Sequence, residues 1–262
     1  MIVHNFSPVF IDFGILQIRW YSLAYVFGIL IGWWYGKIIL RKKVENEIHS
    51  KHFDDLIGYL IIGIIIGGRI GYVLFYNPSF YSENLIEIFK IWNGGMSFHG
   101  GLIGTIVAIY LFSNVKRLNY KIYFDTVSAV APIGIFFGRL ANFINSELYG
   151  TPTEKPWGII FPKVDNLTRH PSQIYEALLE GILLFVIVNI ISFKKKFVPG
   201  MVSGVFLILY GIFRIISEYF REPDEHIGYI LNSLSMGSLL SAGMIIFGLY
   251  FILKINLYEK NK

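Results

Sequence analysis

Residues 122 to 150 read IYFDTVSAVAPIGIFFGRLANFINSELYG, a long apolar run that ends in a group of polar side chains. The apolar part, residues 122 to 142, is long enough to cross a bilayer, because a helical span needs about 20 mostly apolar residues. Near its end lie Arg139, Asn142 and Glu147. The pattern predicts a membrane-spanning helix that carries an arginine, an amide and a carboxylate at one end.

The rest of the chain has the same character. Of its 262 residues, 54% are hydrophobic and 17% are aromatic, more than one soluble core of this length normally holds. We therefore predict an all-α integral membrane protein that forms a single polytopic domain, residues 1 to 262, with seven transmembrane helices. The predicted spans are residues 17–40, 53–77, 95–114, 122–142, 173–193, 199–219 and 234–256.

The positions of the basic residues predict the orientation. Lys and Arg concentrate in residues 41–51, 116–121 and 194–196 and at the C-terminus, which all fall on one side of the predicted spans. By the positive-inside rule this side is cytoplasmic, so the N-terminus is extracytoplasmic and the C-terminus cytoplasmic. The net charge of +5 is thus explained by topology, and we expect no nucleic-acid partner.

Two further features concern the extracytoplasmic side. Residues 1 to 16 lack the basic stretch of a signal peptide, so we expect a short external segment there. The long loop of residues 151–173, between spans four and five, contains four prolines and should be extended rather than helical. The chain has no cysteine, so any thiol in its chemistry must come from a partner.

Ionisable residues inside the spans gather at one depth. Each costs about 3 kcal/mol in the hydrocarbon region, so each needs a reason. Most lie towards the predicted extracytoplasmic end, and Asp125, near the inner face, is the exception. The group consists of Arg69, His99, Arg139, Glu147, Glu176, Glu180, Arg214 and Glu218.

The spacing of these residues places several on common helix faces. Tyr210, Arg214 and Glu218 are four apart, as are Glu176 and Glu180. Lipid cannot satisfy such groups, so these faces should turn into the protein. For any one of them a structural ion pair explains the residue as well as a function does; the concentration of the whole set favours a site.

Glycines four residues apart predict close helix packing in four spans. His99 is flanked by glycines in WNGGMSFHGGLIG, residues 92 to 104, where exposed backbone could approach a ligand. A histidine there is a candidate base, although the residue type alone is weak support. The spaced glycines are Gly63, Gly67, Gly71, Gly100, Gly104, Gly134, Gly138, Gly200 and Gly204.

A site of arginines, a histidine and carboxylates beside the outer leaflet suits a phospholipid head group, because the guanidinium fork matches phosphate oxygens. A transporter would also hold buried charges, but its site is usually at the midplane between related halves. A metalloprotease helix of the His-Glu-x-x-His type is absent, and Ser203 lies at the other end of its span from His99. A seven-span receptor agrees with the helix count but does not need the charges.

Several segments, in order along nearly the whole chain, resemble the bacterial prolipoprotein diacylglyceryl transferases. Residues 138–150, GRLANFINSELYG, match the signature motif of that family, although Ala141 and Ser146 stand where glycine is common. The other matching segments are IRWYSLAY (18–25), GGMSFHGGLIG (94–104), TPTEKPWGIIFP (151–162), RHPSQIYEALLEG (169–181) and YGIFRIISEYFREPD (210–224).

The resemblance implies transfer of the diacylglyceryl group of phosphatidylglycerol to the lipobox cysteine thiol of prolipoproteins, the first step of bacterial lipoprotein maturation. A thioether forms and glycerol phosphate is released, with no cofactor and no metal. It implies a multi-pass protein of the bacterial cytoplasmic (inner) membrane whose active site faces the extracytoplasmic side. Its partners would be phosphatidylglycerol and prolipoprotein signal peptides, and we expect a monomer.

By position, the resemblance also implies functional residues. We expect Arg139 and Arg214 to hold the phosphate and Glu147 and Glu218 to orient them, while His99 or a nearby carboxylate takes the thiol proton. The alternative function is a phospholipid-binding transporter or flippase without covalent chemistry. The implied catalytic residues are His99, Arg139, Glu147, Arg214 and Glu218, and the implied substrate-binding residues are Tyr21, Arg139, Asn142, Gly150, Tyr210 and Arg214.

Overall fold

The computed structural model describes residues 2–14, 17–43, 48–194, 198–223, 229–230 and 234–260. The chain divides into two compact units, one of Met1–Ile39 with Asp125–Lys262 and one of Leu40–Phe124. Its elements are β1 (Ile2–Val3), β2 (Val9–Asp12), β3 (Gln17–Arg19), α1 (Trp20–Lys43), α2 (Ile48–Phe75), α3 (Pro78–Glu83), η1 (Leu85–Phe89), η2 (Ile91–Asn93), α4 (Phe98–Lys116), α5 (Tyr120–Asn145), β4 (Ile159–Ile160), β5 (Thr168–Arg169), α6 (Ser172–Glu176), η3 (Ala177–Leu183), α7 (Leu184–Ser192), α8 (Met201–Glu218), β6 (Tyr229–Ile230), β7 (Leu234–Ser235) and α9 (Met236–Lys260).

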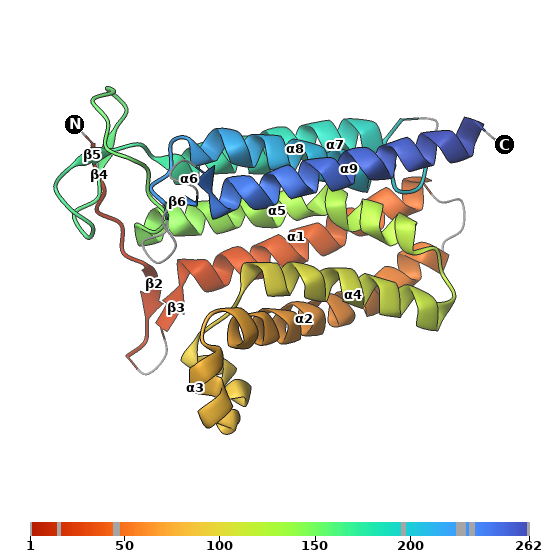
Figure 1. The fold of residues 1–262 in the computed structure, drawn as a ribbon, viewed down its shortest axis with the longest axis horizontal. Coiled ribbons are helices and arrows are strands. Elements are labelled where there is room, and N and C mark those ends of the chain that lie inside the picture. The colour runs from red at the N-terminus through yellow and green to blue at the C-terminus, as the bar shows by residue number, and fades with distance from the viewer. Residues whose placement is uncertain are drawn as a thin grey trace. The chain divides into compact units, whose positions relative to one another are not determined.

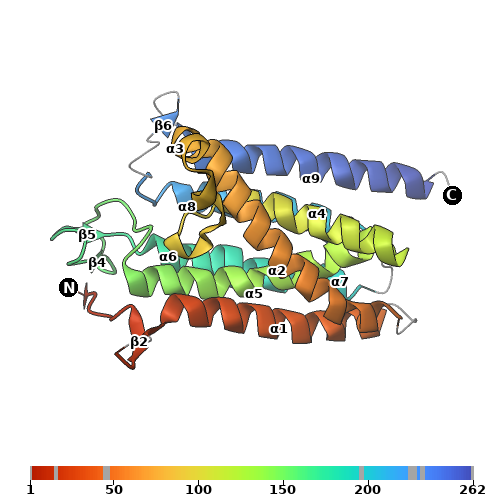
Figure 2. The ribbon, with the colours of Figure 1, turned by 90° about the horizontal axis from the view of Figure 1, so that it is seen from below.

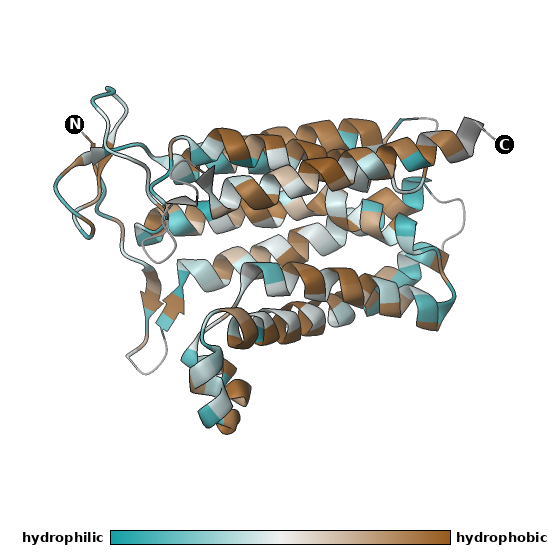
Figure 3. Ribbon diagram, in the orientation of Figure 1, coloured by the Kyte–Doolittle hydropathy of each residue, from teal (hydrophilic) through white to brown (hydrophobic). Residues whose placement is uncertain are grey.

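The helices follow the predicted spans within a few residues. In the described part of the chain six helices are long and apolar enough to cross a membrane: α1, α2, α5, the continuous α6–η3–α7 segment, α8 and α9. The predicted span 95–114 forms α4, a helix of 19 residues that is not among these six, so its crossing of the membrane stays a prediction. In each unit, hydrophobic residues cover most of the helix lengths (Figure 3).

The first unit is held together by side chains from α1, α5, α7 and α8. Ala129, Leu184, Val188, Val202 and Phe213 are among its buried core residues. Burial of such aliphatic and aromatic side chains fills the space between the helices at the density of an organic crystal. The core therefore fixes the side-by-side arrangement of these helices, which is visible in Figure 1 and Figure 2.

Glycines let α8 pack closely on α9 and let η3 pack closely on α5. A Cβ on Gly204 would lie 2.6 Å from Ile252, and one on Gly181 would lie 2.8 Å from the Cβ of Phe136. The predicted packing role is thus confirmed for Gly204. Gly138 is different, because a Cβ there would meet no atom within 4 Å among the described residues.

The second unit is built on a seam of glycines between α2 and α4. A Cβ on Gly67 would lie 2.3 Å from the carbonyl oxygen of Gly100, and one on Gly104 would lie 1.9 Å from that of Gly63. No side chain fits at such distances, so the two backbones touch directly. The glycines that follow His99 in sequence therefore serve helix packing.

Arg69 organises the segment between α2 and α4. Its side chain is buried, and it donates hydrogen bonds to the carbonyl oxygens of Ile88 at 2.8 Å and Gly95 at 3.1 Å, among others in residues 87–95. The guanidinium carbon also lies 5.2 Å from the ring centre of Tyr81. Backbone carbonyls thus accept the hydrogen bonds of the buried guanidinium group. Arg69 therefore has a structural role in the segment that joins α2 and α4.

The N-terminal segment and the loop after α5 form a small sheet, as their extended sequences suggest. β1, from the N-terminal segment, pairs in parallel with β4, and β4 pairs antiparallel with β5. Both β4 and β5 belong to residues 146–171, which contain no helix. The expected extended conformation of the long loop is therefore observed, and the N-terminal segment is anchored to it.

Asp125 caps the N-terminus of α8. Its carboxylate is buried and accepts hydrogen bonds from the backbone N–H of Gly200 at 2.6 Å, the backbone N–H of Ser203 at 2.8 Å and the hydroxyl of Ser203 at 2.6 Å. The first N–H groups of a helix have no partner within the helix, and a carboxylate also complements the helix dipole. This role explains why Asp125 lies apart from the other ionisable residues.

We expect Asp125→Ala to lower the free energy of unfolding by about 1 to 3 kcal/mol, because it leaves the buried N–H groups of α8 without an acceptor. The measurement is the thermal unfolding midpoint in detergent. As a control, Asp55→Asn removes an exposed ion pair to Lys116 and should leave the unfolding midpoint nearly unchanged. Equal midpoints for Asp125→Ala and the unaltered protein would show that the cap contributes nothing.

Candidate functional site

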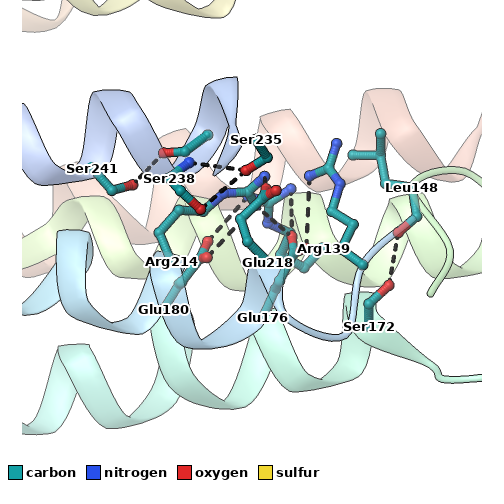
Figure 4. A network of polar contacts seen from close by, with 12 residues as sticks. Arg139, Leu148, Ser172, Glu176, Glu180, Arg214, Glu218, Ser235, Ser238 and Ser241 are labelled. Carbon is teal, nitrogen blue, oxygen red and sulfur yellow. Dashed lines mark hydrogen bonds and ion pairs between the residues drawn. The ribbon is translucent and has the colours of Figure 1, made fainter. Parts of the chain in front are cut away.

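The signature segment turns sharply at the end of α5. Ser146 and Leu148 have φ angles of 60° and 55°, a left-handed conformation that is uncommon outside glycine. Two side chains from α6 hold the turn: Ser172 donates its hydroxyl to the carbonyl of Leu148 at 2.9 Å, and Gln173 donates its amide to the carbonyl of Glu147 at 2.7 Å (Figure 4). Serine at position 146 therefore still makes the turn that glycine favours.

Gly150 joins this turn to the start of α6 and the end of α8. Its N–H donates to the carbonyl of His170 at 3.0 Å, and it forms a bridge with Arg221. A Cβ at this position would lie 2.4 Å from the carbonyl oxygen of His170 and 2.6 Å from that of Phe220. Only glycine fits, so the predicted importance of Gly150 has a structural reason in close backbone contact.

Beside the turn lies a cluster of arginines and glutamates from four segments, which we call the ion cluster. Arg139 contacts Glu176 at 2.8 Å and Glu180 at 3.1 Å. Arg214 contacts the same two carboxylates at 3.2 Å and 3.7 Å, and also pairs with Glu218 (Figure 4). The members of the ion cluster are Arg139, Glu176, Glu180, Arg214, Glu218 and Arg221, the last of which lies 3.7 Å from Glu176.

Burial divides the cluster into an inner and an outer part. The side chains of Glu176 and Glu180 have no exposed surface, whereas 16% of the Arg139 side chain and 11% of the Arg214 side chain are exposed. Buried carboxylates paired in this way hold the guanidinium groups in fixed positions. Arg139 and Arg214 therefore have more exposed surface than the two inner carboxylates and can reach an incoming ligand.

The helix that carries the inner carboxylates is irregular at this point. Residues 177–183, labelled η3, form a π-helical turn that contains Glu180. Such turns are rare within α-helices and occur often at functional sites. Here the turn lies against α5 and brings Glu180, like Glu176, to Arg139.

The structure corrects one predicted pairing. Glu147 does not orient Arg139; it accepts hydrogen bonds from the side-chain amides of Asn142 at 3.1 Å and Asn145 at 3.2 Å, and its own side chain is exposed. The carboxylates that hold Arg139 are Glu176 and Glu180. The predicted pair of Arg214 and Glu218 is present.

The other predicted residues lie on several elements. Asn142 and Tyr210 are buried, and Tyr210 lies one turn before Arg214 on α8. Tyr21 is at the start of α1, with its ring centre 5.2 Å from that of Tyr25. His99 is exposed in the first turn of α4 and belongs to the second compact unit, so its part in the chemistry stays a prediction.

Sequence reasoning left Glu176, Glu180 and Arg221 out of the functional set. The signal for the two glutamates was present, because they share a face within an otherwise apolar span. The sequence did not indicate a role for Arg221, because this residue follows the end of α8 and lies outside the predicted spans. Its contact with Glu176 depends on how α8 packs against α6.

A second group of charged side chains stabilises the loop beside Gly150. Arg169 donates to the carbonyl of Gly150 at 3.0 Å, to Glu222 at 2.9 Å and to Asp165 at 2.6 Å. The hydrogen bonds from Arg169 hold the pKa of Asp165 below its ordinary value. These contacts hold β5 against the signature segment, residues 138–150.

The fold defines a multi-pass membrane protein with paired arginines and glutamates between its helices. The family model for prolipoprotein diacylglyceryl transferase matches residues 8–254. The chain therefore belongs to this family of transferases, as its motifs suggested.

Relatives resemble the chain over almost their whole length. It is 51% identical over 258 residues to the phosphatidylglycerol-prolipoprotein diacylglyceryl transferase of Rickettsia typhi, which covers 98% of this chain and 99% of the relative. The proteins of the same name from Rickettsia felis and Rickettsia rickettsii (strain Sheila Smith) are each 50% identical over 254 residues, covering 96% of this chain and 98% of each relative.

His4 links the N-terminal segment to the signature turn. Its ring is buried beside Phe6, Phe143 and Phe161, and its Nδ1 lies 3.1 Å from the hydroxyl of Ser146. Nε2 has no hydrogen-bond partner among the described residues. Burial among these rings lowers the pKa of His4 below 6.5.

The unfolded chain therefore binds a proton at His4 more readily than the folded chain does, so folded-state stability should fall as the pH is lowered through about 6.5. The measurement is the thermal unfolding midpoint between pH 7.5 and pH 5.5. His4→Phe should lose less stability over this range than the unaltered protein does. The half-buried His52, changed to Gln, serves as the control, and equal pH dependence in the unaltered protein and His4→Phe would contradict the assignment.

Proposed function

We propose that the ion cluster and the turn of residues 146–150 form the site where this transferase moves the diacylglyceryl group of phosphatidylglycerol to the lipobox cysteine thiol of a prolipoprotein. The observation that carries the proposal is the pair of arginines, Arg139 and Arg214, fixed by buried carboxylates yet partly exposed. The names of the relatives supply the two substrates.

The chemistry asks for positive charge at the phosphate. The thiol sulfur attacks a glycerol carbon, a carbon–sulfur bond forms, and the carbon–oxygen bond to the phosphate breaks. The thiol proton passes to a base, and glycerol phosphate leaves with the bonding electrons. Arg139 and Arg214 would bind the phosphate oxygens and stabilise the charge that develops there.

Fixed donors are more effective than mobile ones, because they need no reorganisation during the reaction. Glu176 and Glu180 fix Arg139, and Glu176 with Glu218 fixes Arg214. Asn142 and Glu147 lie in the adjoining turn, with Tyr210 one helical turn from Arg214. Together with Tyr21 and Gly150, these residues would line the path of the lipid head group.

The base is assigned to His99, with a nearby carboxylate as the alternative acceptor of the thiol proton. An imidazole titrates near neutral pH and suits this role. The chain itself has no cysteine, so the thiol comes from the prolipoprotein.

The membrane arrangement is part of the same proposal. The protein would be a single polytopic domain of seven spans in the bacterial inner membrane, with the N-terminus outside and the C-terminus inside. The uneven distribution of Lys and Arg supports this orientation. The site would then face the extracytoplasmic side, and the active form would be a monomer.

The test is transfer by the purified protein in detergent, with phosphatidylglycerol and a synthetic lipobox peptide, followed by mass spectrometry for the diacylglyceryl thioether. Arg139→Ala should reduce product formation at least about 100-fold, because it removes a donor to the developing charge. The exposed Arg117, changed to Ala, is the matched control, and a peptide with Ser in place of Cys should give no thioether. Lipid binding or translocation without product would favour a transporter or flippase.

Replacing His99 with Gln tests the base. Loss of a general base should reduce turnover at neutral pH by about 100-fold or more, with lipid binding retained. His52→Gln is the control for loss of a histidine. Unchanged turnover of His99→Gln would assign proton removal to another group.

A further inference from the structure

With all six of its groups ionised, the ion cluster carries no net charge before a ligand binds. It contains three guanidinium groups, of Arg139, Arg214 and Arg221, and three carboxyl groups, of Glu176, Glu180 and Glu218. Phosphatidylglycerol carries one negative charge on its phosphate. An uncompensated charge is strongly disfavoured in a site removed from water, so a bound phosphate needs a further positive charge or the loss of a negative one.

Glu180 is the carboxylate with the weakest compensation. It lies 3.1 Å from Arg139 and 3.7 Å from Arg214, and it forms no other ion pair among the described residues. Glu176 has closer contacts with the same arginines, at 2.8 Å and 3.2 Å, and a third contact with Arg221. Glu218 pairs with Arg214 and keeps 9% of its side chain exposed.

Among the described residues, those that face Glu180 add no charge beyond that of the ion cluster. α5 presents Arg139 to it, α8 presents Arg214 and the neutral Tyr210, and α6 presents Glu176. The continuing helix α7 has no ionisable side chain. A phosphate bound at Arg139 would share the positive charge of Arg139 with Glu176 and Glu180, and Glu180 has fewer arginine contacts to compensate it.

We propose that Glu180 takes up a proton from solvent when the phosphate of phosphatidylglycerol binds to Arg139 and Arg214. The carboxylate becomes a neutral carboxylic acid, so the total charge of the cluster with its ligand returns to zero. Arg139 is released from one ion pair and can direct that donor to the phosphate. The proton returns to solvent when the site empties. The proposal rests on the proposed function only in taking these two arginines as the phosphate-binding groups.

The direct test counts protons. A short-chain phosphatidylglycerol is titrated into the purified protein by calorimetry, at one pH, in buffers with different heats of ionisation. Uptake of close to one proton per lipid is expected between pH 6 and pH 8. Because binding takes up a proton, the affinity of the protein for the lipid should fall up to about tenfold for each unit by which the pH rises. An infrared difference spectrum should show a carboxylic acid band on binding. Lipid binding with no proton uptake would overturn the inference and leave the proposed function intact.

Variants locate the proton. Glu180→Gln replaces the carboxylate with a neutral amide of the same shape, so it should bind the lipid at least as tightly at pH 8, without proton uptake, pH dependence or the infrared band. Glu83→Gln, which removes an exposed carboxylate of α3 outside the ion cluster, should behave as the unaltered protein does. If His99→Gln abolished the uptake while Glu180→Gln retained it, the proton would belong to the imidazole and the inference would be wrong. No binding of the anionic lipid at all would overturn the proposed function itself.

Discussion

The need to neutralise two fully buried carboxylates shapes the centre of this protein. Glu176 and Glu180 are the two acidic residues of the α6–η3–α7 segment, and among the described residues only Arg139 and Arg214 approach both of them. These contacts connect α5, the α6–η3–α7 segment and α8. Removal of one partner from such a group leaves a buried charge without compensation, so the arrangement of the helices and the integrity of the site depend on the same ion pairs.

The same pairs set the terms for ligand binding. Arginines held by carboxylates are positioned before the substrate arrives, which favours catalysis by fixed charge. The carboxylates also compete with the phosphate for the guanidinium donors. Such a site binds an anion well only if one of the carboxylates of the site can lose its negative charge by protonation. Glu180, which has the weakest contacts, is the group best suited to give up its charge.

Ionisable residues in the helices have three separate uses here, although their sequence positions suggest one group. Asp125 caps α8, and Arg69 binds the backbone carbonyls of the segment that joins α2 and α4. The ion cluster faces the signature turn. Position along a span gives the depth of a charged residue but not its neighbour, and the neighbour decides whether the residue supports the fold or the chemistry.

The sequence by itself determined the helical membrane fold, most helix boundaries within a few residues, and the family, because long apolar runs and ordered motifs are local properties. It also placed Arg214 and Glu218 together, since residues four apart on a helix must be neighbours. Only the tertiary structure showed that Arg139 pairs with Glu176 and Glu180. It also showed that Glu147 accepts a hydrogen bond from Asn142 and that Arg221 contacts Glu176. Those contacts join distant segments, and they follow from the packing of whole helices, which no local pattern contains.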